Sequence, residues 1–349
     1  MSNSFNLLFT LGRPFSPVYS LLMKVREKLY SGGIFRSESF DVPVISIGNL
    51  MLGGTGKSPT VAHIARLLLK HDHRPAIISR GYRGKAVDRV NVVSDGKNIR
   101  LSADLAGDEP FMLAETLPAV PVLTGRRRLY PCRHAVDEFN ADVLILDDAF
   151  QHLGVKRDID IVLFDGTTLA GNSRIFPGGP LREPVSALRR CHAFLITGTT
   201  ADNSSRVDRF SELLSQRFSD KPVYRSRSNN FRLTLKDGTV TTKSTPTPYF
   251  AFCGIANPSR FSESLENFGA TVSGFHALRD HVTYDQALMA EICAMAERCG
   301  AEKLITTEKD YVKLKHLSCN LEICLFQVDY QVDSSFDQFI IEKIAQFRP

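Results

Sequence analysis

The chain has 349 residues, of which 43% are hydrophobic and 23% are charged, and it contains no tryptophan. This composition is typical of a folded globular protein and excludes disordered, collagen-like and coiled-coil chains. The length favours two domains over one. The sequence lacks the ~18 consecutive apolar residues that a bilayer-spanning helix needs, so we expect no such helix.

The seven cysteines are an odd number, and no two of them form a C-x-x-C ligand pair. We therefore expect a reducing compartment. The residues after Met1 contain neither a basic region nor a small-residue cleavage site behind an apolar core, so we also expect no export signal.

Residues 1–36 contain five basic residues and one acidic residue, so most of the formal net charge of +5 lies at this end. Helical spacing from Pro17 onward places five apolar residues on one face: Val18, Leu21, Leu22, Val25 and Leu29. Lysines and arginines flank this face, and a Ser-Gly-Gly sequence ends the helix. Two interpretations are open: a helix lying on an anionic membrane surface, or a helix packed on the core. The charge asymmetry favours the membrane surface.

The next part of the chain alternates between apolar runs with strand and helix character. These runs are 42–47, 62–69, 76–79, 111–117, 143–146 and 159–164. Such alternation predicts a doubly wound α/β domain.

A hairpin with Asp237-Gly238 at its turn is predicted within residues 229–246, and we expect this segment to link two domains. The α/β pattern then resumes in 249–252, 259–268, 284–298, 304–306 and 323–328. The predicted organisation is an amino-terminal helix region 1–40, a first domain 41–228, the hairpin linker 229–246 and a smaller α/β domain 247–349.

The strongest chemical signal is the sequence Gly53-Gly54-Thr55-Gly56-Lys57-Ser58 between a predicted strand and a predicted helix. Glycines let backbone N–H groups surround a triphosphate, Lys57 reaches its β and γ phosphates, and Ser58 offers a hydroxyl to Mg²⁺. The strict phosphate-loop pattern has glycine where this chain has Met51. The alternative is a simple glycine turn with an exposed lysine.

A second signal is the apolar strand 143–146, which ends in Asp147 and Asp148. A carboxylate at that strand end can hold hydrated Mg²⁺ beside Ser58, whereas the alternative is a solvated acidic turn. No N-K-x-D guanine-recognition sequence is present, since Thr307-Glu-Lys-Asp310 has a different order. ATP is therefore favoured, and a regulatory GTPase stays open.

Several further motifs accompany the glycine loop in a defined order. They are Gly48-Asn-Leu-Met-Leu-Gly-Gly-Thr-Gly-Lys-Ser-Pro59, Ser79-Arg-Gly-Tyr-Arg-Gly84, Gly107-Asp-Glu-Pro110, Asp147-Asp-Ala-Phe-Gln-His152, Gly179-Pro-Leu-Arg-Glu-Pro184, Phe252-Cys-Gly-Ile-Ala-Asn-Pro258 and Thr307-Glu-Lys-Asp310. Through them the chain resembles the tetraacyldisaccharide 4′-kinase family of lipid A biosynthesis, from about residue 42 to residue 313. The absence of glycine at position 51 is usual in that family.

The resemblance implies transfer of the ATP γ-phosphate to the 4′-hydroxyl of a tetraacyl disaccharide 1-phosphate. It implies a P-loop NTPase-like doubly wound domain and a smaller α/β domain joined by a two-stranded linker. It also implies a peripheral protein at the cytoplasmic face of the inner membrane, with 1–40 as its membrane-surface region.

The resemblance further implies that Asp108 is the base that accepts the hydroxyl proton, paired with His281. Val282 stands where a second histidine is expected, and Ala149 stands where glycine is usual. Glu109 either binds metal or caps a helix, the two roles being equally consistent with its position. Gln151 is expected to orient the nucleotide phosphates.

Arginines are the expected contacts to the anionic lipid and to the transferring phosphoryl group. The candidates are Arg80, Arg83, Arg126, Arg127, Arg128 and Arg182. We expect ATP and Mg²⁺ as cofactors, no nucleic acid partner and no obligate protein partner. Two alternatives remain: a membrane-associated switch that hydrolyses nucleotide slowly, and a soluble kinase of small molecules.

Overall fold

The computed structural model describes residues 9–280, 282–314 and 317–347. The chain divides into two compact units: the first contains Met1–Arg227 and Gln331–Pro349, and the second contains Ser228–Tyr330. The chain passes from one unit to the other within two strands, β8 (Val223–Thr234) and β13 (Glu322–Val332). Among the described helices, none has both the length and the hydropathy that crossing a bilayer requires.

These boundaries differ from the predicted ones in two ways. The hairpin that we expected to be the linker belongs to the second unit, and the carboxy-terminal helix α11 (Ser334–Ala345) belongs to the first. The reason for the second difference is a tertiary contact, because α11 packs on helix α3 (Lys57–Lys70). The contact includes a 2.6 Å hydrogen bond between His63 Nε2 and Asp337 Oδ1, 274 residues apart.

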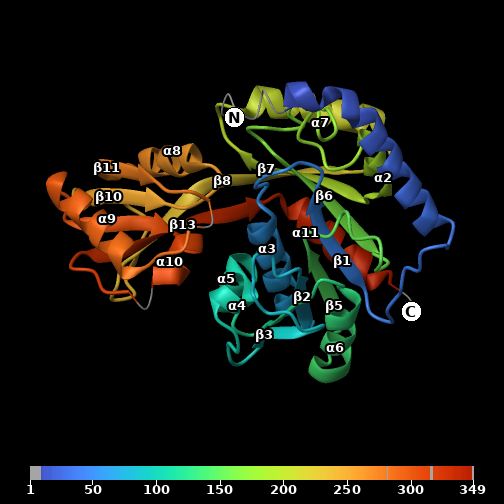
Figure 1. Cartoon of the computed structure of the whole chain (residues 1–349), viewed down its shortest axis with the longest axis horizontal. Helices are drawn as coiled ribbons and strands as arrows, with labels where there is room; N and C mark the ends of the chain where they lie inside the picture. Colours follow the sequence, from blue (N-terminus) through green and yellow to red (C-terminus); the bar gives the residue numbers. More distant parts are fainter. Residues whose placement is uncertain (1–8, 281, 315–316, 348–349) are drawn as a thin grey trace. The chain divides into compact units, whose positions relative to one another are not determined.

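The first unit is built on a mainly parallel sheet in the order β8-β7-β6-β1-β5-β2-β4-β3 (Figure 1). Its other strands are β1 (Val44–Asn49), β2 (Pro75–Ser79), β3 (Asn91–Asp95), β4 (Pro121–Thr124), β5 (Val143–Asp147), β6 (Ile159–Asp165) and β7 (Ala193–Thr199). Only β3 pairs antiparallel among the neighbours described here, with β4. Strand β1 lies between β5 and β6 and pairs parallel to both.

Helices cover this sheet, so that its central strands β1, β5 and β6 are buried along their whole length. They are α2 (Ser16–Ser31), α3, α4 (Ala103–Ala106), α5 (Asp108–Thr116), α6 (Leu129–Phe139), α7 (Ser204–Arg217) and α11, with 3-10 turns η1 (Arg13–Phe15) and η2 (Val185–Arg190). One core cluster joins α6 to β1, β2, β4 and β5, and another joins α7 to β6 and β7.

The second unit has strands in the order β11-β10-β12-β13-β8, with β9 (Val240–Thr241) paired antiparallel to β8. Its remaining elements are β10 (Pro248–Cys253), β11 (Thr271–Ala277), β12 (Lys303–Thr307), α8 (Pro258–Phe268), α9 (Gln286–Arg298) and α10 (Glu308–Leu314). Alternate residues of β10 enter different clusters: Tyr249 and Ala251 pack with α8, whereas Phe250 and Phe252 pack with α9. Both faces of this strand are therefore covered, and the predicted smaller α/β unit is present.

Helix α2 exposes its apolar face and turns its polar face toward the first unit. Val18, Leu21, Leu22 and Val25 are 45–61% exposed, and no residue of α2 is fully buried. The core-packed interpretation of this helix is therefore wrong for these four side chains. The inward face contains Tyr19 and Arg26, both hydrogen-bonded to backbone carbonyls of the unit.

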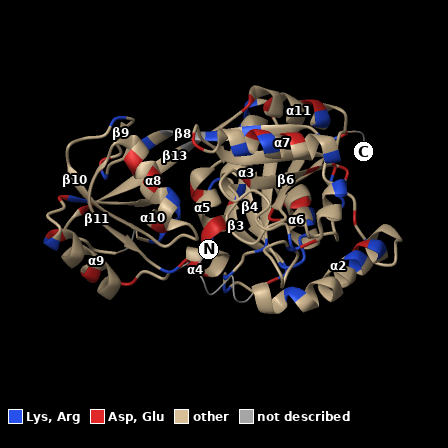
Figure 2. Ribbon diagram, turned by 90° about the horizontal axis from the view of Figure 1, so that it is seen from above, with Lys and Arg blue, Asp and Glu red and all other residues tan. Residues whose placement is uncertain are grey.

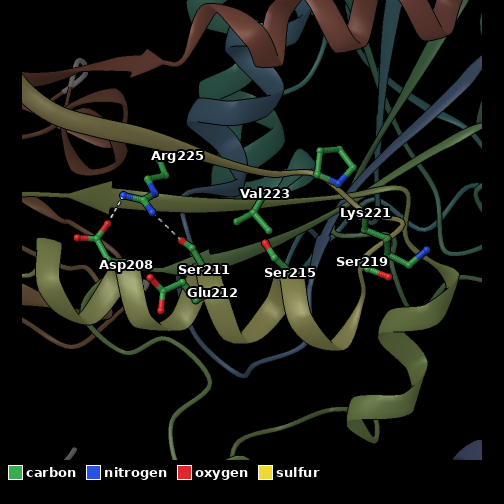
Figure 3. Close-up of a pocket in the computed structure, with 9 residues that line it drawn as sticks. Asp208, Ser211, Glu212, Ser215, Ser219, Lys221, Val223 and Arg225 are labelled. Atoms are coloured by element: carbon green, nitrogen blue, oxygen red, sulfur yellow. Dashed lines mark hydrogen bonds and ion pairs between the residues drawn. The ribbon is translucent and has the colours of Figure 1, made fainter.

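A groove of about 540 Å³ lies between α7 and β8 in the first unit (Figure 3). Arg225 of β8 donates hydrogen bonds to Asp208 and Ser211 of α7, at 2.5 and 3.1 Å. These contacts fasten the start of β8 to the first unit. None of the candidate site residues lines this groove.

Gly48, near the end of β1, is predicted to tolerate no side chain. A Cβ at this position would lie 2.6 Å from Phe150 Cβ and 2.7 Å from the Phe150 nitrogen. We expect Gly48→Ala to cost about 1–3 kcal/mol of unfolding free energy, because a packed core does not absorb an added methyl group. Thermal denaturation of the nucleotide-free protein measures this as a fall in Tm of several degrees.

Gly54→Ala is the matched control, since a Cβ there would have no atom within 4 Å. A Tm for Gly48→Ala equal to that of the Gly54→Ala control would contradict the steric argument.

Candidate active site

The glycine loop leaves the buried strand β1 and leads directly into α3. Gly56 adopts φ +73° as the residue before the helix, and Gly53 adopts φ +116°, both of which favour glycine. Lys57 and Ser58 therefore occupy the first turn of α3, where unpaired backbone N–H groups and the helix dipole attract phosphate. The structure thus forms the strand–loop–helix arrangement that the sequence predicts.

The loop is held by side chains on both sides. Asn49 Nδ2 donates a hydrogen bond to the Gly53 carbonyl at 3.3 Å, and Thr197 Oγ1 of β7 donates one to the Thr55 carbonyl at 3.0 Å. Thr197 also fills the space beside Gly56, because a Cβ there would lie 3.1 Å from its hydroxyl. Sequence reasoning assigned no role to Asn49 or Thr197; only Asn49 lies inside a quoted motif.

Asp147 ends β5 beside the strand that carries the loop, since Ile47 and Asp147 are partners in the parallel register. Ser79, at the end of the neighbouring β2, donates a 3.2 Å hydrogen bond to Asp147 Oδ2. The other oxygen, Oδ1, is buried and accepts no hydrogen bond from the described residues. Burial, followed by the nearby carboxylates of Glu109 and Asp148, raises the pKa of Asp147 to about 7.

Asp148 is partly exposed and lies beside two cations. Arg182 Nη1 donates to both of its oxygens, at 3.0 and 3.1 Å, and Lys57 Nζ lies 3.5 Å from Oδ1. Burial acts to raise the pKa of Asp148, but Lys57 and Arg182 outweigh it, so this pKa lies below its ordinary value. Asp148 has φ +46°, a left-handed conformation that turns the chain directly after β5.

Asp108 and Glu109 begin α5 and are both partly buried. Gly107 precedes them with φ +92°, and a Cβ there would lie 2.6 Å from the Tyr82 carbonyl. The segment 79–84 therefore packs closely against the start of α5. Glu109 is near enough to Asp147 to affect its pKa, which places α5 at the same end of the sheet as the glycine loop.

Arg182 pairs with Asp148, and Arg127 is exposed; the other candidate arginines divide into two groups. Arg128 is only 5% exposed and forms no ion pair with a described residue, while Asp147, Arg80 and Asp148 all influence its pKa. Burial lowers the pKa of its guanidinium below the ordinary value. By contrast, Arg80, Arg83 and Arg126 are exposed, with the Arg83 guanidinium stacked 5.6 Å from the Tyr82 ring centre.

Gln151 is fixed from two directions. Its side-chain Nε2 donates to the Asn49 backbone carbonyl at 2.9 Å, and its backbone carbonyl accepts a 2.9 Å hydrogen bond from Arg26 Nη2 of α2. The structure thus brings Gln151 to the base of the glycine loop. Sequence reasoning missed the part played by Arg26, because no local pattern links residues 125 positions apart.

His281, the expected partner of Asp108, lies outside the described residues. Its neighbour Asp280 accepts a 2.7 Å hydrogen bond from Lys309 within the second unit. The described residues contain no cluster of three or more His, Cys, Asp or Glu side chains that could hold a metal ion. Mg²⁺ needs no such cluster, because it commonly uses one or two carboxylates together with phosphate and water oxygens.

Comparison with known proteins agrees with this geometry. A family model described as LpxK, tetraacyldisaccharide-1-P 4′-kinase, matches residues 8–345. The tetraacyldisaccharide 4′-kinase of Desulfotalea psychrophila is 45% identical over 343 residues, which is 98% of each chain. That of Syntrophus aciditrophicus is 38% identical and aligns with 94% of this chain and 91% of its own.

A solved structure also matches: the crystal structure of LpxK from Aquifex aeolicus in complex with ATP has a TM-score of 0.74 and 28% identity. The match covers 95% of this chain and 98% of that one. It confirms the P-loop NTPase-like α/β fold. The chain belongs to the tetraacyldisaccharide-1-P 4′-kinase family, LpxK.

Proposed function

We propose that this protein transfers the γ-phosphoryl group of ATP to the 4′-hydroxyl of a tetraacyl disaccharide 1-phosphate, a step of lipid A biosynthesis. The observation that carries the proposal is the juxtaposition at the start of α3. There Lys57 leaves the glycine loop beside Asp148, and Asp147 holds one buried carboxylate oxygen without a partner. In a member of this family, that arrangement is suited to a triphosphate and its cation.

The nucleotide phosphates are proposed to bind the backbone of Gly53–Gly56 and the Lys57 ammonium, with Gln151 beside them. A phosphate at this point would compete with Asp148 for Lys57, which lies 3.5 Å away and is free to rotate on its flexible side chain. Arg182 would then remain on Asp148 and hold it in place. Under this proposal the two cationic neighbours of Asp148 have different roles: Lys57 moves to the phosphate, and Arg182 stays on Asp148.

The proposed Mg²⁺ ligands are Ser58 and Asp147. The orphaned Oδ1 of Asp147 supports this assignment, because an unpaired buried carboxylate oxygen is costly unless a cation or donor meets it. Asp148 has its oxygens engaged by Arg182, so we assign the metal to Asp147 rather than to Asp148. Glu109 is a further acidic neighbour. Bound Mg²⁺ would neutralise part of the negative charge of the phosphates.

Asp108 is proposed as the general base. Its carboxylate would accept the proton of the attacking 4′-hydroxyl while the new P–O bond forms and the bond to ADP breaks. The support is positional, since Asp108 begins the helix whose next residue, Glu109, acts on Asp147. The pairing of Asp108 with His281 stays a prediction.

Arginines are proposed to stabilise charge on the transferring group and on the lipid phosphate. Arg128 is the candidate for the transferring group, since its buried guanidinium has no described ion partner and lies near Asp147. The exposed Arg80, Arg83 and Arg126 are candidates for the 1-phosphate of the lipid. A desolvated guanidinium stabilises developing charge more strongly than an exposed one.

We also propose that the protein binds the cytoplasmic face of the inner membrane through α2. The support is the exposed apolar face of this helix together with its lysines and arginines, which Figure 2 shows along α2. A helix with an apolar face toward the bilayer and basic residues at its borders is suited to an anionic surface.

Replacing Asp108 tests the proposed chemistry. With MgATP and detergent-dispersed tetraacyl disaccharide 1-phosphate, we expect Asp108→Asn to lower kcat about 10²- to 10⁴-fold, the usual contribution of a general base. Radiolabel from γ-labelled ATP appearing on the lipid is the measurement. The matched control is Asp104→Asn, which changes an exposed carboxylate in α4 and should leave kcat unchanged. Label that never reaches lipid, with ATP hydrolysis independent of the acceptor, would instead indicate a nucleotide switch.

Replacing Lys57 tests the phosphate site. We expect Lys57→Ala to lower kcat/KM for ATP about 10²- to 10³-fold, because a charged contact to the terminal phosphates is lost. Lys70→Ala, at the exposed far end of the same helix, is the control and should behave as the unaltered protein. Equal kcat/KM values for the two variants would show that Lys57 does not contact the nucleotide.

Replacing the exposed leucines of α2 tests the membrane contact. Leu21→Ser with Leu22→Ser should weaken binding to vesicles containing anionic phospholipid at least about tenfold, because each leucine contributes roughly 1.5–3 kcal/mol on burial. Vesicle flotation measures this binding. The control is Leu213→Ser, an equally exposed leucine on α7 at 54%. Undiminished flotation of the double variant would exclude α2 as the membrane contact.

A further inference from the structure

The inward face of α2 is bonded to the backbone of two residues of the candidate site. Tyr19 OH donates a 3.1 Å hydrogen bond to the Arg182 carbonyl, and Arg26 Nη2 donates a 2.9 Å hydrogen bond to the Gln151 carbonyl. The two contacts lie about two turns apart on one side of α2, roughly a quarter turn around the helix from the centre of its exposed apolar face.

The segment between residues 174 and 182 connects this helix to the glycine loop. On one side Ser16 Oγ donates to the Ile175 carbonyl at 3.0 Å and accepts from the Gly178 nitrogen at 2.8 Å. On the other side the Leu52 nitrogen donates to the Pro180 carbonyl at 2.9 Å. The Arg182 nitrogen likewise donates to the Leu50 carbonyl at 2.7 Å. One short stretch of backbone is therefore bonded to α2 and to the phosphate loop together.

Tyr19 is well placed to act on Arg182 through this backbone. Its ring packs edge-on against Phe176, with centroids 5.6 Å apart, which restricts where the hydroxyl can point. The phenol is a protonated donor at neutral pH, and burial, followed by the Glu183 carboxylate, raises the pKa of Tyr19 further above its ordinary value. The guanidinium of Arg182 in turn holds Asp148.

We propose that Tyr19 is a positioning residue for phosphoryl transfer: by fixing the Arg182 backbone, the inward face of α2 sets Arg182 on Asp148 beside Lys57. This inference rests on the proposed kinase function and adds a second role for α2 besides membrane contact. It assigns the two roles to different side chains on two adjacent faces of one helix. The roles are therefore separable by substitution.

Tyr19→Phe removes the hydrogen bond and keeps the ring on Phe176. With detergent-dispersed acceptor, where vesicle binding has no part, we expect kcat to fall about three- to tenfold, the range that one hydrogen bond supports. KM for ATP and vesicle flotation should stay unchanged. Tyr30→Phe is the matched control, because the Tyr30 hydroxyl makes no hydrogen bond to a described residue; its ring contacts Phe35 and Arg26. The Leu21/Leu22 serine variant should differ from Tyr19→Phe by showing weak vesicle flotation.

A double-mutant cycle distinguishes positioning from general destabilisation. In an Arg182→Gln background, Tyr19→Phe should cost nothing further, because the group that it positions is absent. The stoichiometry of MgATP binding in calorimetry should equal that of the unaltered protein. The proposal would be overturned if Tyr19→Phe had the same kcat as the unaltered protein. It would also be overturned if Tyr19→Phe lowered kcat by the same factor in the Arg182→Gln background, or if the stoichiometry of MgATP binding fell together with kcat. Absence of lipid product from the unaltered protein would instead overturn the proposed function itself.

Discussion

The site depends on Asp147, a buried carboxylate of which only one oxygen has a hydrogen-bond partner among the described residues. Asp147 enters the sheet as the last residue of β5, next to β1, and Ser79 satisfies only one of its oxygens. Leaving the other oxygen unpaired costs free energy, and two more carboxylates lie nearby. Burial and the neighbouring carboxylates therefore raise the pKa of Asp147, and a cation at its unpaired oxygen would act in the opposite direction.

The neighbouring carboxylate has the opposite environment. Asp148 points at Lys57 and Arg182, and its pKa is lowered although burial acts to raise it. The pKa values of these two successive aspartates are thus shifted in opposite directions. The reason is that the chain turns at Asp148, so the two side chains lie in different surroundings. This difference supports the proposal that Asp147 binds the metal ion and that Asp148 pairs with the side chains of Lys57 and Arg182. A run of two aspartates in the sequence does not reveal which is which.

Helix α2 illustrates how a polar face can be the one that packs on the protein. Its tyrosine and arginine bond to carbonyl groups, while its leucines and valines remain exposed. A water-soluble helix normally has the reverse arrangement, so the exposed apolar face is the unusual feature of α2. The polar contacts give the helix a defined orientation relative to Arg182 and Gln151, and hence relative to the phosphate loop.

The sequence by itself determined the features that depend on local order. The alternation of strands and helices, the glycine loop before α3, the Asp147-Asp148 strand end and the amphipathic α2 were all predicted, because period, turn residues and motif spacing are local properties. The joint order of the motifs also indicated the family.

Only the tertiary structure decided which residues far apart in the sequence form hydrogen bonds and ion pairs with one another. It placed α11 in the first unit through His63 and Asp337, gave Asp148 to Lys57 and Arg182, and turned the polar side of α2 to Arg182 and Gln151. These outcomes depend on contacts between residues tens to hundreds of positions apart. Such contacts are set by how the faces of the sheet are covered, which no local pattern encodes.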